Sequence, residues 1–422
     1  MINKKVAITN IDKIVSGDIN NPILKADTIL IENGIIKEVG YSNELNIKDT
    51  SITIDANGLV ICPGFIDPHV HPPLEDYSPQ NRMLGPMEEG CMWGITTFIS
   101  EGEQGPGLPR FYEWDPQGVK ATAILAKKIF DRYRPGGAKV HGGALVLAKG
   151  LTKNDFKEMA DAGVWLIGEI GGGGLAEVEE VLPMIDWARE YRFFISVHYG
   201  PRLIPGATTM TTEDVLKINP NKVAHANGGT TAAPYDQTME LLEKTKCGIE
   251  IVTYGNPRMT YEIIEKLKKR GELHRVVFGS DGFTGQGYLP NAIHRAIIIT
   301  SSMNKLPAEK AIAMGTGNTA RLYNLNRGII EPGKEADLIA IDAPPGSSGE
   351  NALEAIELGD TFGVAMVMVD GRIVALRGRD TRPVRKWIKI NGKEAIVSDI
   401  NEYLFDPPRT YGVFSEVGLY KV

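Results

Sequence analysis

The sequence predicts an α/β fold, a closed (β/α)8 TIM-like barrel with a flanking β-sandwich that is built from both ends of the chain. The first observation is that residues 61–327 alternate short apolar runs with helical segments, which is typical of parallel strands joined by crossover helices. The second is that residues 1–60 and 328–380 read mainly as short strands separated by turn residues. Residues 381–422 follow as a C-terminal extension.

The two terminal pieces are predicted to form one β-sandwich. Asn-Gly at 33–34 and Asp-Gly at 370–371 are hairpin signals between apolar runs. The alternative is that the two pieces are unrelated appendages. The extension contains a further Asn-Gly hairpin signal, at 391–392. The predicted sandwich strands are Val6–Thr9, Thr28–Glu32, Ile36–Val39, Ile52–Ile54, Asp337–Ile341, Gly363–Val369 and Arg372–Leu376.

The central segment is predicted to close into a barrel rather than to form an open doubly wound sheet. Polar residues end several of its strands, and a barrel mouth brings strand ends from the whole segment together, whereas an open sheet spreads them apart. The predicted strands are the run before His69 and then Thr96–Ser100, Lys139–Val146, Val164–Ile170, Phe194–His198, Lys222–His225, Gly248–Thr253 and Val276–Asp281. The predicted helices include Leu151–Asp161, Leu175–Glu190, Thr212–Ile218, Tyr235–Lys244, Thr260–Lys269, Asn291–Met303 and Ala308–Met314.

The composition is that of an ordinary globular enzyme and argues against two classes of partner. The 422 residues carry a formal net charge of −7 without a basic patch, which disfavours nucleic acid. No apolar run approaches the roughly 18 residues that a membrane helix needs, and the N-terminus lacks a signal-peptide core. The three cysteines are too few and too scattered for a disulfide framework. We therefore expect a cytoplasmic protein with a small-molecule substrate.

Six polar residues at the ends of apolar runs indicate a metal site. His69 and His71 are two residues apart, so both imidazoles of a strand end point to one face. Imidazole and carboxylate suit a divalent first-row metal such as Zn, Fe or Mn. Each motif alone has a plain structural alternative, such as a Pro-rich turn for the histidine pair. The other four residues each follow a separate apolar run: Glu169, His198, His225 and Asp281.

With this pattern the chain resembles the amidohydrolase superfamily. Further matching segments are the phrase Gly-Lys-Glu-Ala-Asp-Leu at 333–338 and the phrases Lys-Val-His-Gly-Gly at 139–143 and Gly-Val-Trp at 163–165. The last two are similar to a branch of the superfamily that opens cyclic amides. The resemblance implies two divalent metal ions, Zn with Fe or a second Zn, in a homotetramer. It implies one ion on His69, His71 and Asp281, the other on His198 and His225, and Glu169 as the bridge between them.

The resemblance implies hydrolysis of a small cyclic amide, or lactam. Water held between the metals ionises near neutrality and attacks the carbonyl carbon, and Asp281 is the catalytic residue that passes the proton to the leaving nitrogen. Lys139 and His141 repeat the two-residue spacing on the third strand. We interpret them as substrate-binding residues, with a structural role as the alternative. The run Gly171–Gly174 is interpreted as a loop at the barrel mouth.

Other functions are open on the same fold. The first is a mononuclear deaminase, and the second is a hydrolase of linear amides or peptides. A non-enzymatic relative is disfavoured because all six ligand positions carry competent residues. The segment Pro72–Glu75 departs from the cyclic-amide branch, because it is bulkier and stiffer directly after the first ligands. The ring size of the substrate, and whether it bears a carboxylate, are therefore left open.

Overall fold

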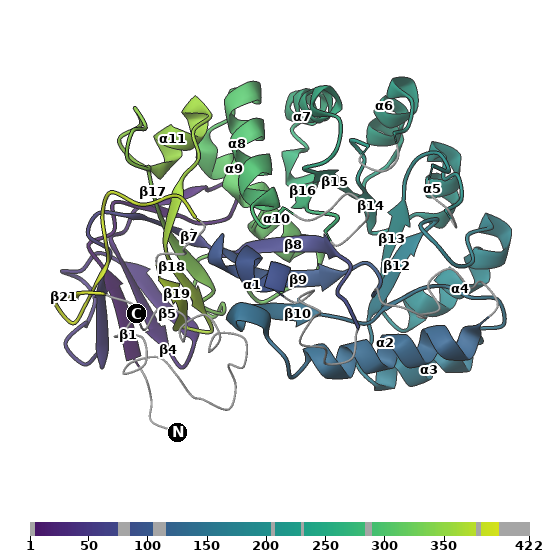
Figure 1. The fold of residues 1–422 in the computed structure, drawn as a ribbon, viewed down its shortest axis with the longest axis horizontal. Coiled ribbons are helices and arrows are strands. Elements are labelled where there is room, and N and C mark those ends of the chain that lie inside the picture. The colour runs from purple at the N-terminus through teal and green to yellow at the C-terminus, as the bar shows by residue number, and fades with distance from the viewer. Residues whose placement is uncertain are drawn as a thin grey trace.

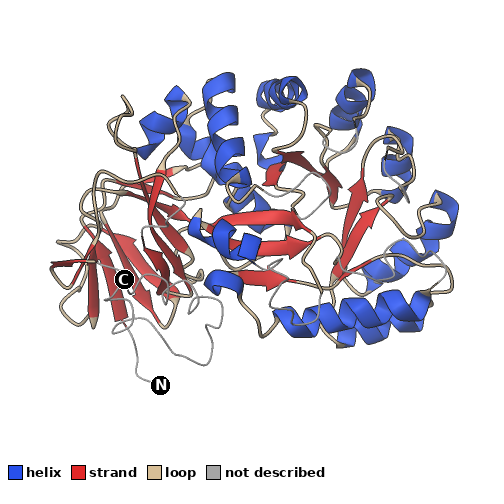
Figure 2. Cartoon of the chain, viewed as in Figure 1, coloured by secondary structure: helices blue, strands red, loops and turns tan. Residues whose placement is uncertain are grey.

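The structure is a computed structural model, and it shows two connected bodies, a β-sandwich and a ring of strands and helices. Figure 1 shows that the sandwich contains both the purple N-terminal strands and the yellow-green C-terminal strands. In the ring the strands lie inside and most helices lie outside, as Figure 2 shows. The residues that the structure describes are 5–74, 85–103, 115–203, 207–228, 232–282, 289–376 and 381–395.

Among the described residues, the ring consists of eight parallel strands, the third of which is interrupted. β8 pairs with β9 and β9 with β10, while β11 to β16 pair in sequence order. The ring closes where Val70, at the end of β8, forms a parallel bridge with Gly282, just beyond β16. The closed barrel is thus confirmed over the open sheet. The strands are β8 (Phe65–Val70), β9 (Ile95–Ser100), β10 (Lys139–His141), β11 (Ala144–Leu145), β12 (Leu166–Ile170), β13 (Phe194–His198), β14 (Lys222–Ala224), β15 (Gly248–Val252) and β16 (Val276–Gly279).

The break between β10 and β11 has a local cause. Gly143 lies there with a φ of +90°, and a Cβ at this position would come within 2.5 Å of the Ala123 carbonyl oxygen of the covering helix. The backbone N–H of Gly143 leaves the strand ladder and donates to the buried Glu103 carboxylate at 2.6 Å. The single strand predicted over 139–146 is therefore two short strands, because glycine and a buried acceptor let the chain bend toward the helix.

Helices cover the outside of the barrel, and most of those predicted are present. α3 begins two residues later than predicted because Thr152 is its cap: its hydroxyl accepts from the N–H of Asp155, and the Asp155 carboxylate accepts from the N–H of Thr152. Four helices, α1, α2, α10 and α11, were not predicted from the sequence. The helices are α1 (Gly85–Met92), α2 (Pro116–Phe130), α3 (Lys153–Asp161), α4 (Val178–Glu190), α5 (Thr212–Ile218), α6 (Tyr235–Lys244), α7 (Pro257–Arg270), α8 (Ala292–Asn304), α9 (Ala308–Met314), α10 (Gly317–Leu322) and α11 (Ala352–Leu358), with 3-10 turns η2 (Pro135–Gly137) and η3 (Leu273–Arg275).

Both ends of the chain share the sheets of the sandwich, so they are not unrelated appendages. N-terminal β7 pairs with β17, and β6 pairs with β20 of the extension. A buried apolar cluster that includes Ile8, Ile61 and Met366 packs between the two sheets. The predicted hairpin of the extension is β20 and β21. The sheet orders are β21-β20-β6-β1-β4-β5 and β19-β18-β17-β7-β2-β3. The strands are β1 (Lys5–Thr9), β2 (Lys13–Val15), β3 (Ile23–Leu24), β4 (Thr28–Glu32), β5 (Ile35–Gly40), β6 (Ile52–Asp55), β7 (Val60–Pro63), β17 (Leu338–Asp342), β18 (Gly363–Val369), β19 (Arg372–Leu376), β20 (Lys389–Ile390) and β21 (Lys393–Glu394).

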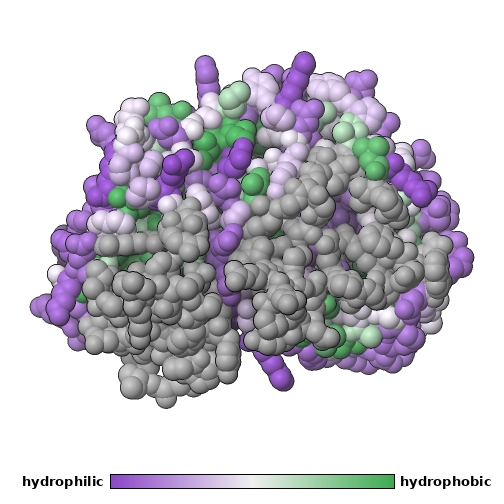
Figure 3. Space-filling view, viewed as in Figure 1, coloured by the Kyte–Doolittle hydropathy of each residue, from purple (hydrophilic) through white to green (hydrophobic). Residues whose placement is uncertain are grey.

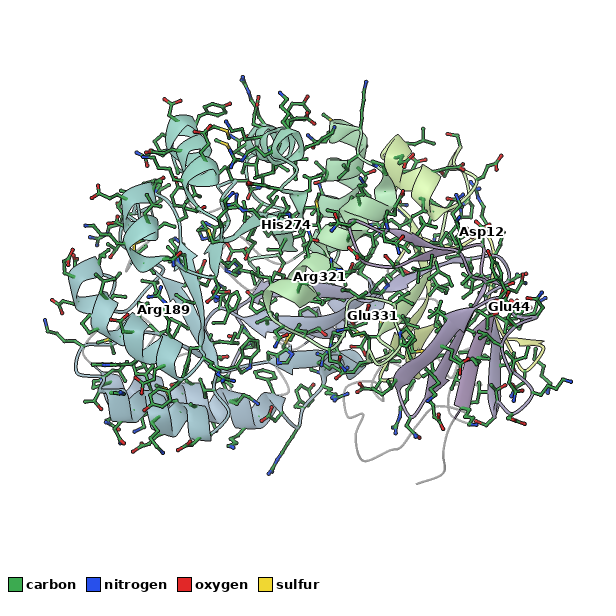
Figure 4. All side chains as sticks on the ribbon, turned by 180° about the vertical axis from the view of Figure 1, so that it is seen from behind. Asp12, Glu44, Arg189, His274, Arg321 and Glu331 are labelled. Atoms are coloured by element: carbon green, nitrogen blue, oxygen red, sulfur yellow. The ribbon has the colours of Figure 1, made fainter. Side chains whose placement is uncertain are left out.

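Ion pairs join the barrel to the sandwich. Lys139, the first residue of β10, contacts Asp337 at 2.8 Å and Asp370 at 2.7 Å, and both acids belong to the sandwich strands or their turns. Arg321 of α10, labelled in Figure 4, pairs with Asp18 at 2.9 Å. Domain boundaries near residues 60, 328 and 380 stay a prediction.

The surface in view carries mostly hydrophilic side chains. Among the coloured atoms of Figure 3, purple hydrophilic residues dominate the outline of the molecule, and the green hydrophobic ones form small separate groups. Some large apolar side chains, such as those of Met303 and Leu358, are exposed, which is common in globular proteins. In the described part of the chain, no helix combines the length and the apolar character needed to cross a membrane.

Candidate metal centre

The barrel brings all six predicted ligands to the carboxyl ends of its strands. His69 lies near the end of β8, Glu169 near the end of β12 and His198 at the end of β13. The other three, His71, His225 and Asp281, lie just beyond β8, β14 and β16. All six side chains are buried. Parallel strands of a barrel end at one rim, which is why residues spread over more than 200 positions of sequence meet there.

Three of these residues form one group of converging ligand atoms. The Nε2 atoms of His69 and His71 lie 3.3 Å apart. The same atoms lie 3.4 and 3.5 Å from Oδ1 of Asp281. These atoms are close enough together to hold one metal ion, as the resemblance implied.

The second group is Glu169 with two histidines. Nδ1 of His198 lies 3.3 Å from Oε2 of Glu169, and Nε2 of His225 lies 3.0 Å from Oε1. The same Oε1 is also 3.4 Å from Nε2 of His69, in the first group. Glu169 therefore lies between the two groups, which is the position of a bridging ligand.

The donor atoms fit divalent cations. Oε1 of Glu169 is buried and has no hydrogen bond of acceptable geometry among the described residues, a costly state for a carboxylate oxygen without a cation. Gly172 leaves space beside the other carboxylate oxygen, because a Cβ there would lie 3.2 Å from both Oε2 of Glu169 and Nδ1 of His198. Gly172 belongs to the glycine run that was predicted to be a mouth loop. Imidazole nitrogens with carboxylate oxygens suit Zn, Fe or Mn.

Two of the predicted ligand positions have a left-handed backbone. His225 and Asp281 adopt φ values of 34° and 50°, in a region that residues other than Gly adopt uncommonly. For His225 such a conformation costs of order 1–3 kcal/mol, and conformations of this kind concentrate at functional sites. Both residues lie just beyond their strands, at the rim where the other predicted ligands lie.

The backbone around Asp281 is held by a neighbouring strand. Oδ1 of Asp67 accepts from the N–H of Ser280 at 3.0 Å and from the N–H of His69 at 3.1 Å. The Ser280 hydroxyl donates to the His69 carbonyl oxygen at 3.1 Å. These bonds tie the end of β16 to β8 and so fix Asp281 against the histidine pair. Sequence reasoning missed Asp67, although a carboxylate two residues before the histidine pair was a visible signal.

The imidazoles around Glu169 affect the pKa of its carboxylate. Burial raises this pKa, whereas His69 and His198, when they carry a proton, lower it well below its usual range. An ionised carboxylate is the form that binds a cation.

The structure does not bring Lys139 and His141 to the six ligands. Lys139 lies at the opposite end of the third strand, in the ion pairs with Asp337 and Asp370 described above. His141 packs its ring 5.4 Å from that of Trp165, which precedes β12. Burial lowers the pKa of His141 to about 3, and the charge of Arg327 adds to this effect. His141 is therefore a neutral imidazole packed on Trp165, and neither residue belongs to the two groups of converging ligand atoms.

The segment that follows the histidine pair and His274 do not add to the six predicted ligands among the described residues. In the segment Pro72–Glu75, Glu75 lies outside the described residues. His274, labelled in Figure 4, lies in η3 before β16, at the opposite end of that strand from Asp281. Four of the seven histidines thus belong to the two groups of converging ligand atoms.

The closed (β/α)8 barrel carries two groups of ligand atoms at its rim, with the Glu169 carboxylate between them. These features place the chain in the class of (β/α)8 barrel proteins with a candidate metal centre at the carboxyl ends of the strands. The particular family is the amidohydrolase family, to which this chain belongs, and residues 153–374 match it.

Known relatives agree with this assignment. Enamidase of Eubacterium barkeri is 41% identical over 387 residues, which cover 92% of this chain and 99% of that protein. The crystal structure of enamidase at 1.9 Å matches with a TM-score of 0.87 at 41% identity, covering 92% of this chain and 100% of that one. A β-aspartyl dipeptidase from Fervidobacterium islandicum AW-1 has a TM-score of 0.61 at 18% identity, with coverage of 92% and 100%. The dipeptidase shares the fold.

Proposed function

We propose that this protein is a metal-dependent hydrolase that opens a small cyclic amide, in the manner that the name enamidase indicates for its 41% identical relative. The observation that carries the proposal is the position of Glu169 between two groups of ligand atoms. Oε1 is 3.0 Å from His225 and 3.4 Å from His69. A carboxylate in this position offsets repulsion between two cations, which favours a binuclear site over the mononuclear site of a deaminase.

The reaction adds water across the C–N bond of the ring. When bound, the two metals supply Lewis-acid polarisation of the carbonyl and activation of water. Asp281 takes the proton that the water loses and gives it to the leaving nitrogen. One C–N bond breaks and one C–O bond forms, so the product carries a carboxylic acid and an amine on one open chain.

The first prediction concerns metal content. We expect two ions per chain, Zn with Fe or a second Zn, because the six residues form two groups of ligand atoms and Glu169 of the second group lies 3.4 Å from His69 of the first. Elemental analysis of protein purified without chelators measures the stoichiometry. A content that stays at one ion per chain after reconstitution with excess metal would contradict the binuclear site.

The second prediction concerns the substrate. We expect kcat/KM for small lactams to exceed that for a linear amide of the same size, because the relative with 41% identity spans nearly the whole barrel. The assay compares a six-membered lactam with a carboxylate, the same lactam without it, and the linear amide. Preference for the linear amide would exclude ring opening. Equal rates for the two lactams would exclude only the binding of a substrate carboxylate, for which Arg202, exposed just beyond His198, is one candidate among the described residues.

We further propose a cytoplasmic homotetramer. The support is the resemblance to the cyclic-amide branch together with three free cysteines, of which Cys62 and Cys91 are buried. Free buried thiols are typical of a reducing compartment.

A further inference from the structure

A buried group of charged side chains lies directly beneath the candidate metal centre. Lys222 of β14 and Glu250 of β15 are 0% exposed, and Glu101, just beyond β9, is 3% exposed. The Lys222 ammonium lies 2.8 Å from Oε1 of Glu101 and forms an ion pair with Oε2 of Glu250. Its third acceptor is the carbonyl oxygen of Pro68, at 3.1 Å. All three donors of the ammonium therefore have partners inside the barrel.

The other oxygen of Glu250 reaches a proposed metal ligand. Oε1 of Glu250 lies 2.7 Å from Nδ1 of His69. An ionised carboxylate only accepts hydrogen bonds, so Nδ1 carries the proton and Nε2 has its lone pair available. That Nε2 is the atom that lies 3.4 Å from Asp281 and from Glu169. The two oxygens of Glu250 thus have different partners: Oε2 pairs with Lys222 and Oε1 accepts from His69.

Stability alone does not account for this group. Buried ion pairs repay their desolvation only with good geometry, and apolar residues of similar volume often stabilise a fold as well or better. The barrel interior contains apolar side chains, for example Ile66, Ile99 and Phe194, together with polar ones such as Ser196, the register partner of Lys222 on β13. A lysine between two glutamates, one of which contacts His69, therefore indicates a function that apolar side chains cannot perform.

We propose that Lys222 is a positioning residue for the metal centre: it holds one oxygen of Glu250, so that the other oxygen accepts from Nδ1 of His69 and Nε2 of His69 faces the metal. The inference rests on the proposed function, because it needs a metal at His69. It adds a specific role for Lys222, which contacts no ligand itself. Partners of ligating histidines of this kind commonly change metal affinity by about 10–100-fold when they are altered.

The test uses the difference between the oxygen of a glutamine amide, which accepts hydrogen bonds, and its NH2 group, which donates them. In Glu250→Gln, Lys222 attracts the amide oxygen, so the amide NH2 turns toward Nδ1 of His69 and donates to it. The proton of His69 then moves to Nε2 and blocks the metal. We expect the affinity for one of two zinc ions to fall by about 10–100-fold, while the affinity for the other stays within a few fold. Competition with a chromogenic chelator measures both dissociation constants, and circular dichroism verifies the fold.

The double variant Lys222→Met/Glu250→Gln separates positioning from a structural role. Without the ammonium, the amide is free to turn its oxygen to Nδ1 of His69, so we expect most of the lost zinc affinity to return. A purely structural role predicts the opposite, because a second buried change adds damage. The matched control is Asp337→Asn, which also removes a buried carboxylate from a lysine but contacts none of the ligands. We expect it to keep both zinc affinities.

The outcomes decide between the proposals. Unchanged zinc affinities in Glu250→Gln, or no recovery in the double variant, would overturn the role of Lys222. If Glu250→Gln does not fold, the double variant Lys222→Met/Glu101→Gln replaces it, because this variant keeps the net buried charge unchanged. It must then bind one of the two zinc ions more weakly. Unchanged zinc affinities in this variant would equally overturn the role of Lys222. If the parent protein does not bind two zinc ions, the proposed function itself would be refuted.

Discussion

Glu169→Gln is expected to lose metal and activity together while the barrel is retained. Glutamine has nearly the same shape but carries no charge, so it cannot offset two cations that the four histidines and Asp281 bring together. A metal contributes several kcal/mol to such a reaction, and each 1.36 kcal/mol corresponds to a factor of ten. We therefore expect kcat to fall by at least about 10³-fold.

The fold does not depend on the charge of Glu169. Its side chain faces the rim among the other ligands, at 7% exposure, whereas neighbouring Leu166 and Ile167 pack into apolar clusters. Metal analysis, circular dichroism and turnover on one protein preparation test the prediction. The control is Glu179→Gln on α4, whose side chain is 80% exposed and should keep metal and rate. Full metal content with near-normal turnover in Glu169→Gln would show that another group bridges the ions.

The ligand set was predictable because it depends on a local pattern. An apolar run with a polar residue at its end is visible in sequence, as at Phe194–His198 and at Val276–Asp281. In a barrel all strand ends meet at one rim, so the pattern alone implies that the ligands converge. The distances confirm the convergence for all six residues.

The supporting residues were missed because their partners are distant in sequence. Glu250 stands within the apolar run Gly248–Val252, which is a visible anomaly. Its hydrogen bond to His69, however, spans 181 positions, and no spacing rule connects them. The helix α2 was also missed, although Asp115 before Pro116 is a helix-start signal: the Asp115 carboxylate accepts from the N–H of Gly118 at 2.8 Å.

Lys139 and His141 show that residue spacing alone does not predict whether a side chain reaches the metal centre. They repeat the two-residue interval of His69 and His71, but the interval fixes only the face of a strand and not the height along it. Lys139 pairs in register with Thr97 of β9, three positions before Ser100, so it lies far below the rim. The acids that bind it come from the sandwich, which the barrel pattern alone does not place.

Asp281→Asn is expected to separate catalysis from metal binding. Asparagine retains one oxygen for the metal group of His69 and His71, but it cannot take a proton from water. We expect kcat to fall by about 10²–10⁴-fold, the range for loss of a general acid–base group. Metal content should fall less than in Glu169→Gln, because the two histidines, whose Nε2 atoms lie 3.3 Å apart, remain.

The choice of asparagine follows from the backbone at this position. Asp281 has a φ of 50°, and asparagine tolerates the left-handed region at least as well as aspartate, whereas alanine would add strain to the chemical change. Asp370→Asn is the matched control, because Asp370 has a φ of 49° in the turn between β18 and β19 and should keep the catalytic rate. Single-turnover kinetics with metal analysis on both variants measures the two effects separately. A rate within tenfold of the parent for Asp281→Asn would exclude Asp281 as the proton carrier and leave it as a metal ligand and turn residue.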